Sequence, residues 1–227
     1  MGKKIIISRK KVVTFIGILV VVLALAAIIV QVTLNVNDSK IIRVACMGDS
    51  ITDERYSEYT SDLQNMLGEN YTAKSFGIMG ATVLFDTYHP YWEEDDFSEA
   101  QEFLPDIVVI MLGTNDARPD NFGSIDNFVG DYIKIIKQIQ LLGTKPKVFI
   151  VKPPPIFENV VELVPENFSE EIIPRIEEVA NTLNLEIIDV YSVMQNHPEY
   201  LIDGVHPNAE GSTVIATQVY NAIIGSG

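Results

Sequence analysis

Ser50, Asp203 and His206 are three residues whose types could together carry out nucleophilic catalysis. A serine hydroxyl is a weak nucleophile unless a base takes its proton, and histidine is the side chain best suited to this task at neutral pH. His206 follows Asp203 by three residues. In a short turn, this spacing can bring the carboxylate to one ring nitrogen and leave the other nitrogen free. The pattern favours acyl transfer, although ordinary turns would also explain a serine at position 50 and an Asp–His pair of this spacing.

The other two histidines of the sequence, His89 and His197, are weaker candidates for the base. Each of them precedes a proline, and no rule of spacing assigns either ring a carboxylate that would orient it. We therefore interpret both as loop residues.

Acyl transfer also needs hydrogen-bond donors aimed at the oxygen that becomes negatively charged. The first candidate is the backbone N–H of Ser50, which we expect at the start of a helix, where the helix dipole helps. The others are the backbone N–H of Gly80, where the missing side chain permits close approach, and the side-chain amide of Asn115. We expect Asp49 and Asp116 to brace these loops by accepting backbone hydrogen bonds.

Five short segments are strand candidates, and those at 41–47 and 106–112 have the composition of buried strands in a parallel sheet. The five candidates comprise residues 41–47, 72–76, 106–112, 147–151 and 186–190. Between and after them, apolar residues recur at helical spacing in four stretches. These stretches comprise residues 59–67, 128–143, 172–183 and 214–223. Strands that alternate with helices predict an α/β fold, in which helices cover both faces of a parallel sheet.

Polar or glycine-rich clusters follow four of these strands. GDS follows the first strand, FGIMGAT the second and GTND the third, and DGVHP comes shortly after the fifth. In open parallel sheets, ligands bind outside the carboxyl ends of the strands. We therefore expect Ser50, Gly80, Asn115 and His206 to meet at one edge of the sheet. The longest segment without clear periodicity, residues 83–98, could form a substrate-facing loop.

The N-terminal part of the chain differs in composition from the rest. A basic tail, residues 1–11, precedes the largely apolar segment 12–34, which would extend about 35 Å as a helix. A bilayer core is about 30 Å thick, and signal peptides usually have shorter apolar regions. We therefore predict a single-pass membrane anchor with a cytoplasmic N-terminus, a linker at 35–40, and an extracytoplasmic domain at 41–227. Secretion after signal cleavage is the alternative.

Charge and cysteine content exclude further classes of function. The chain beyond residue 37 has a formal charge of −20, from 11 basic and 31 acidic residues. Such an acidic surface argues against binding to DNA, RNA or anionic lipid headgroups. Cys46 is the only cysteine, which rules out an intrachain disulfide, and its apolar surroundings predict a buried thiol.

The polar clusters resemble the four sequence blocks of the SGNH (GDSL-type) serine hydrolase family. The blocks are GDSIT with Ser50, FGIMGAT with Gly80, GTND with Asn115, and DGVHP with Asp203 and His206. They occur in the family order across residues 48–207. The resemblance implies a flavodoxin-like three-layer α/β/α fold with about five parallel strands, a Ser-His-Asp mechanism, and no metal or other cofactor. Ser75 stands where the family commonly has Asn, a departure that leaves the donor glycine intact.

Within this family, three segments are similar to a branch of carbohydrate O-acetyl esterases: TYHPYW, PDIVVIMLGTND and KPPPIF. The similarity implies that the substrate is a small ester or an acetylated glycan. Tyr88, Tyr91 and Trp92 could then stack on sugar rings, or they could simply pack over the sheet edge. Nothing in the sequence indicates the oligomeric state.

Three alternative functions stay open at this point. A membrane location would suit a lysophospholipase or another longer-chain acyl-ester hydrolase with an apolar groove. Asp49, Asn115, Asp203 and His206 could instead hold a divalent metal for phosphoester cleavage, although no Asp-x-His motif lies upstream. A non-catalytic glycan-binding module is the alternative outside the enzymes. An ordinary α/β-hydrolase is disfavoured, because Ser50 does not lie in a Gly-x-Ser-x-Gly motif.

Overall fold

The computed structural model describes residues 18–28, 30, 41–157 and 162–225. The chain divides into two units, residues 1–40 and 41–227. Residues 18–28 of the first unit are helical and exposed. Among the described residues, no helix is both long and apolar enough to cross a membrane. The predicted tail and linker, and parts of the predicted anchor at 12–34, lie outside the described residues.

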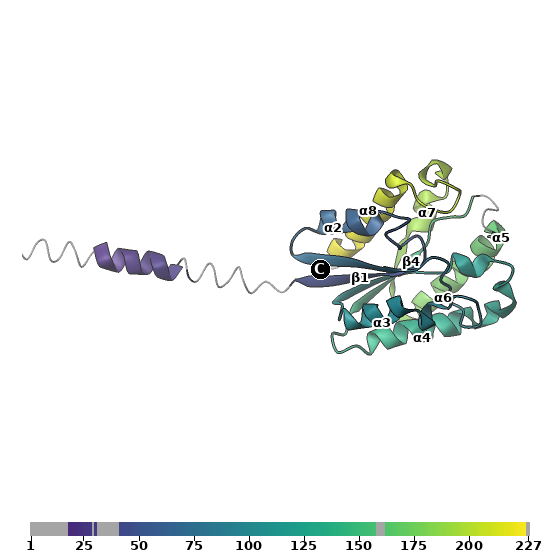
Figure 1. Cartoon of the computed structure of the whole chain (residues 1–227), viewed down its shortest axis with the longest axis horizontal. Coiled ribbons are helices and arrows are strands. Elements are labelled where there is room, and N and C mark those ends of the chain that lie inside the picture. The colour runs from purple at the N-terminus through teal and green to yellow at the C-terminus, as the bar shows by residue number, and fades with distance from the viewer. Residues whose placement is uncertain (1–17, 29, 31–40, 158–161, 226–227) are drawn as a thin grey trace, which may run out of the picture. The chain divides into compact units, whose positions relative to one another are not determined.

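A five-stranded, all-parallel sheet forms the centre of the described part of residues 41–227 (Figure 1). Its strands are β1 (Ile42–Gly48), β2 (Tyr71–Gly77), β3 (Ile107–Met111), β4 (Lys147–Lys152) and β5 (Glu186–Asp189). They lie in the order β2-β1-β3-β4-β5, with β1 paired to both β2 and β3. This is a flavodoxin-like order, and its topological switch point lies between β1 and β3. The predicted parallel α/β fold is confirmed.

Helices cover both faces of the sheet and complete a three-layer arrangement (Figure 1). One face carries α2 (Tyr59–Leu67), α7 (Val190–Met194) and α8 (Ala209–Gly225). The other carries α3 (Asp95–Glu102), α4 (Phe128–Gln140) and α6 (Ile173–Leu183), with the short α5 (Pro165–Asn167) ahead of α6 in the chain. Side chains alternate along β1, so Val44 and Cys46 pack in the core beneath α2, α7 and α8. Ala45 and Met47 pack in the core beneath α3, α4 and α6. Because β1 is buried on both faces, the side chains on both of its faces are apolar.

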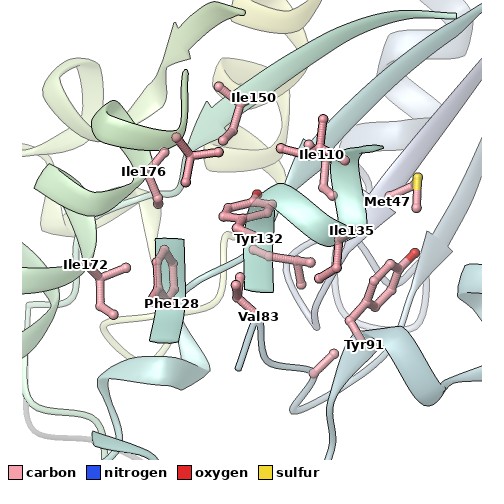
Figure 2. Close-up of a cluster of buried hydrophobic side chains, with 14 of the residues drawn as sticks. Met47, Val83, Tyr91, Ile110, Phe128, Tyr132, Ile135, Ile150, Ile172 and Ile176 are labelled. Atoms are coloured by element: carbon pink, nitrogen blue, oxygen red, sulfur yellow. The ribbon is translucent and has the colours of Figure 1, made fainter. Parts of the chain in front are cut away.

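The core on the α4 side shows how periodicity in the sequence becomes packing (Figure 2). Phe128, Tyr132 and Ile135 recur at helical spacing along α4 and are fully buried. They belong to the same cluster as Ile110 of β3 and Ile150 of β4. Burial of each such side chain contributes about 1.5–3 kcal/mol. One stripe of α4 therefore holds the helix against the sheet, as its spacing predicted.

The segment 83–98, predicted to be a substrate-facing loop, is only partly a loop. A 3-10 turn occupies Tyr91–Glu93, and α3 begins at Asp95. Periodicity did not reveal α3 because the helix is short and buries only Phe97 and Ala100, in a segment that is otherwise largely acidic.

Candidate active site

Ser50 lies in a turn that follows β1. Our expectation that a helix begins there is wrong, because the chain turns several times before α2 starts at Tyr59. The carboxylate of Asp49 accepts the N–H of Ile51 at 2.9 Å, and the Asp49 carbonyl accepts the N–H of Thr52 at 3.0 Å. A side chain that bonds to the nearby backbone favours a turn over a helix. The turn leaves Ser50 only 6% exposed.

A continuous chain of hydrogen bonds joins Ser50, His206 and Asp203. Oγ of Ser50 lies 2.9 Å from Nε2 of His206, and Nδ1 of His206 lies 2.7 Å from Oδ2 of Asp203. Both ring nitrogens of His206 are engaged, which fixes the ring orientation and favours the tautomer with its proton on Nδ1. In that tautomer, Nε2 can accept the hydroxyl proton of Ser50.

A tight loop before α8 holds Asp203 and His206 together. Oδ1 of Asp203 accepts the backbone N–H groups of Val205 at 3.0 Å and of His206 at 2.8 Å. Gly204 has a φ of 82°, a left-handed conformation that favours glycine. Its carbonyl accepts the N–H of Phe157 at 3.0 Å. Phe157 ends the PPPIF segment after β4, so this segment braces the loop that carries His206.

The pKa of Asp203 lies below its ordinary value. Burial alone would raise it, but hydrogen bonds from the backbone and imidazole of His206 and from the Val205 N–H outweigh that effect. Asp203 is therefore a carboxylate at neutral pH. It can stabilise the positive charge that His206 acquires when the ring accepts a proton.

Gly80 and Asn115 come from the ends of the two strands that flank β1. Gly80 follows β2 with a φ of 82°, and Asn115 begins a short 3-10 helix after β3. Nδ2 of Asn115 donates to the carbonyl of Ala81 at 3.0 Å and lies 3.4 Å from Oδ2 of Asp49. These contacts tie the loops after β1, β2 and β3 together. Because the second contact is long, one amide hydrogen is only weakly held and can serve a developing oxyanion.

Asp49 and Asp116 both accept backbone hydrogen bonds within these loops. Asp116 accepts the N–H groups of Val83 at 3.0 Å and of Leu84 at 2.9 Å, which holds the segment that follows Gly80. Both carboxyls are fully buried. Burial raises the pKa of Asp49 to about 6 and the pKa of Asp116 to about 7.

A cavity of about 400 Å³, here called the first cavity, opens beside two of the candidate oxyanion donors. It is lined by Gly80, Thr82, Tyr88, His89, Asn115, Arg118, Asp120 and Asn121. Most of these side chains are polar, and Tyr88 is 90% exposed. Several of the lining residues were not predicted, because they lie in loops whose paths carry no periodic signal.

Tyr91 belongs to the core, Trp92 is partly buried and packs against that core, and neither lines the first cavity. Tyr91 is fully buried, and its hydroxyl donates to the carbonyl of Phe76 at 2.6 Å, so the prediction that it contacts substrate is wrong. Trp92 stacks on Phe97 with ring centroids 5.4 Å apart and packs against Phe85 at 5.1 Å. The alternative interpretation of these aromatic residues, packing at the sheet edge, describes both of them.

His89 and His197 each have a carboxylate neighbour that spacing did not reveal. Nδ1 of His89 lies 3.4 Å from Oε1 of Glu94, and Nδ1 of His197 lies 2.8 Å from Oε1 of Glu199. His89 lines the first cavity, so it is the one of the two that lies at the site. Within the described residues, no three His, Cys, Asp or Glu side chains are grouped as metal ligands would be.

A family model of GDSL-like lipases and acylhydrolases matches residues 46–214. The chain belongs to this family. An acetylxylan esterase from Xylanibacter ruminicola is 35% identical to this GDSL-family chain over 207 residues, which cover 80% of the chain and 43% of that protein. A GDSL esterase/lipase from Arabidopsis thaliana is 26% identical over 140 residues, which cover 54% of the chain and 45% of that protein. The chain thus spans less than half the length of these curated relatives.

A solved structure has the same fold as the GDSL-family domain. The carbohydrate acetylesterase Est24 from Sinorhizobium meliloti superimposes with a TM-score of 0.65 at 20% identity, over 82% of this chain and 100% of that chain. The family match confirms the resemblance to GDSL-type hydrolases that the four sequence blocks indicated, and this likeness confirms the three-layer fold that the resemblance implied. The switch point between β1 and β3 is where Ser50 and Asn115 lie.

Proposed function

We propose that this GDSL-family chain is a serine esterase that removes O-acetyl groups from a carbohydrate. The observation that carries the proposal is the pair of short contacts at His206. Its Nε2 lies 2.9 Å from the Ser50 hydroxyl, and its Nδ1 lies 2.7 Å from the Asp203 carboxylate. This arrangement supplies a nucleophile, a base to activate it, and a carboxylate to orient the base.

In the first half-reaction, Oγ of Ser50 bonds to the ester carbonyl carbon while the hydroxyl proton passes to Nε2 of His206. The carbonyl oxygen becomes negatively charged, and the N–H groups of Ser50 and Gly80 and the Asn115 amide donate hydrogen bonds to it. Each such donor typically lowers the barrier by about 3–4 kcal/mol. The bond to the sugar oxygen then breaks, and His206 gives its proton to that oxygen. The products are a free sugar hydroxyl and acetyl-Ser50.

In the second half-reaction, water replaces the sugar hydroxyl. His206 takes a proton from the water while the water oxygen bonds to the acetyl carbon. The same donors stabilise the oxyanion that forms. Collapse releases acetic acid and returns the proton from His206 to Oγ of Ser50. Asp203 remains a carboxylate in both halves, and its lowered pKa supports this role.

The substrate class is supported by the relatives and by the chemistry of the first cavity. The relative of highest identity named above is an acetylxylan esterase. Thr82, Asn115 and Asn121 give the cavity polar walls, which suit a short acyl group and would be desolvated at a cost by a long alkyl chain. The chain beyond residue 37 carries 11 basic and 31 acidic residues, a formal charge of −20. This negative charge also disfavours an anionic lipid surface as substrate.

The proposal is tested by measuring acetate release from acetylated xylo-oligosaccharides, alongside nitrophenyl esters of increasing acyl length. The full chain and its Ser50→Ala variant are compared, with and without a metal chelator. We expect turnover by the full chain, a preference for acetyl over octanoyl, no effect of the chelator, and loss of turnover in the variant. Undiminished turnover by Ser50→Ala would contradict the mechanism. A rate that rises with acyl length would favour a longer-chain hydrolase, and sugar binding without turnover would favour a binding module.

We also propose that residues 12–34 anchor the chain in a membrane, with the esterase domain on the extracytoplasmic side. The length and composition of the segment and the basic residues before it support this arrangement. The full chain, expressed in a bacterium, should stay in the membrane fraction after alkaline extraction and keep its N-terminal sequence. Recovery of a shortened, secreted protein would instead indicate signal cleavage.

A further inference from the structure

A second cavity, of about 220 Å³, lies beside the loop that carries His206 and shares no lining residue with the first cavity. Its lining includes Glu54, Arg55, Tyr56, Glu58, Ile202 and Pro207. Ile202 and Pro207 belong to the loop that carries His206. The Tyr56 ring lies 6.2 Å from the imidazole of His206, measured between ring centroids. The two cavities therefore adjoin different groups of the site: the oxyanion donors in one case and the general acid in the other.

Ester hydrolysis assigns the two halves of a substrate to different sides of such a site. The carbonyl oxygen must face the donors at Gly80 and Asn115, because they stabilise its negative charge. The alcohol oxygen must come within hydrogen-bond reach of Nε2 of His206, because it takes the proton held there when the C–O bond breaks. The alcohol thus leaves from the side of His206, where the second cavity lies, while the carbonyl oxygen faces the donors that border the first cavity.

The lining of the second cavity suits a neutral, hydroxyl-rich alcohol. Tyr56 is 41% exposed and Ile202 is 73% exposed, so an aromatic ring and an aliphatic side chain are available to the apolar face of a sugar. The carboxylates of Glu54 and Glu58 can accept hydrogen bonds from hydroxyl groups. They outnumber the single guanidinium of Arg55, which is already paired with a buried carboxylate. This balance of charge disfavours a phosphate or a uronate in the cavity.

We propose that the second cavity binds the neutral sugar whose acetyl group is removed, with the Tyr56 ring against the apolar face of that sugar. This inference rests on the proposed esterase function and adds the location and the charge of the leaving alcohol. It makes Tyr56 a determinant of specificity for the acylation step. Deacylation proceeds from acetyl-Ser50 after the sugar has left, so that step does not depend on Tyr56.

The test compares Tyr56→Ala and Tyr56→Phe with the unmodified full chain on two acetates that differ only in the alcohol, a neutral acetylated xylo-oligosaccharide and ethyl acetate. Tyr56→Ala should lower kcat/KM for the oligosaccharide about tenfold, the scale of one aromatic contact, and change that for ethyl acetate less than about twofold. Tyr56→Phe should retain the oligosaccharide activity, because it keeps the ring. The rate of deacylation, measured in a single turnover, should be the same in all three proteins.

Tyr88→Ala provides the comparison at the first cavity, and it should alter the preference between acetate and butyrate esters of one alcohol. Equal losses on both acetates in Tyr56→Ala, or no loss on either, would overturn the inference. A loss of oligosaccharide activity in Tyr88→Ala alone would also overturn it, by placing the sugar in the first cavity. Failure of the unmodified chain to hydrolyse any acetate would count against the esterase function itself, and turnover restricted to non-sugar acetates would count against its carbohydrate substrate.

Discussion

Oγ of Ser50 and Nε2 of His206 lie 2.9 Å apart, although the two residues are 156 positions apart in the chain. Ser50 follows β1, and His206 lies in the loop that leads into α8. A parallel sheet brings these distant segments together because its strands all end at the same edge. The contact also depends on two local structures. Asp49 accepts the N–H of Ile51 in the turn that carries Ser50, and Asp203 accepts the N–H of Val205 in the loop that carries His206.

Asp203→Asn should lower kcat by about 10³–10⁴-fold with little change in KM. The asparagine amide would donate to Nδ1 of His206, which places the ring proton on Nε2 and leaves no acceptor for the Ser50 hydroxyl. Initial rates on a short-chain acetate measure the effect, and the thermal midpoint shows whether the variant is folded. A folded variant with less than about a tenfold loss would show that Asp203 does not set the tautomer of His206.

Asn115→Ala should lower kcat by about 10²–10³-fold and leave KM within a few-fold, because the lost donor acts on the oxyanion and not on the bound ester. The matched control is Asn121→Ala. Asn121 lines the same cavity and donates to the backbone carbonyl of Asn115 at 2.8 Å, but it is not a candidate oxyanion donor. Steady-state kinetics should show a far smaller loss of kcat in the control. Equal losses would mean that Asn115 only supports the loop.

The fold and the meeting of the site residues could be predicted because both follow from simple rules. Apolar runs such as Ile107–Met111 indicate buried parallel strands, and the carboxyl ends of parallel strands converge. One local detail could not be predicted. Ser50 lies in a turn because the Asp49 side chain bonds to the backbone at Ile51, and propensity alone does not report that competition.

The directions of side chains and the paths of loops at the site could not be predicted from the sequence. The composition of TYHPYW shows aromatic residues but not which of them point inward. The bond from Tyr91 to the carbonyl of Phe76 and the stacking of Trp92 on Phe97 decide that question through tertiary contacts. Tyr56 could not be assigned to the site for a related reason, because its position beside His206 depends on a contact between remote loops.

Asp116→Asn should flatten the pH dependence of stability. Burial raises the pKa of Asp116 from 3.8 to about 7. The folded state therefore keeps this proton through a pH window in which the unfolded state has lost it, so the free energy of unfolding falls as pH rises through that window. The variant lacks this group and should show a smaller fall, by up to about 1.4 kcal/mol per pH unit.

Urea unfolding of this variant at about pH 5 and about pH 8 measures that slope. Asp126→Asn is the control for removal of a charge, because the Asp126 side chain is 99% exposed. The control should keep the slope of the unmodified chain. The same slope in Asp116→Asn would show that the buried carboxyl does not titrate as its burial implies.

Two glycine substitutions should have opposite effects on stability. A methyl group at Gly48 would overlap Oγ1 of Thr52 and lie 2.5 Å from the carbonyl oxygen of Met111, so Gly48→Ala should destabilise the domain by about 1–3 kcal/mol. A methyl group at Gly130, within α4, would meet no atom within 4 Å. Gly130→Ala should therefore stabilise the helix by about 0.5–1 kcal/mol. Urea unfolding measures both, and a stabilised Gly48→Ala would contradict the close packing at the end of β1.

The most direct measurement of the central claim is mass spectrometry of the full chain after acid quenching during turnover of an acetate ester. Activation of Ser50 by His206 predicts a fraction of the protein that is heavier by one acetyl group, with the acetyl on the peptide containing Ser50 and absent from Ser50→Ala. Asp203→Asn should accumulate this species more slowly. Turnover with the acetyl group on another residue, or equal acetylation of Ser50→Ala, would contradict Ser50 as the nucleophile.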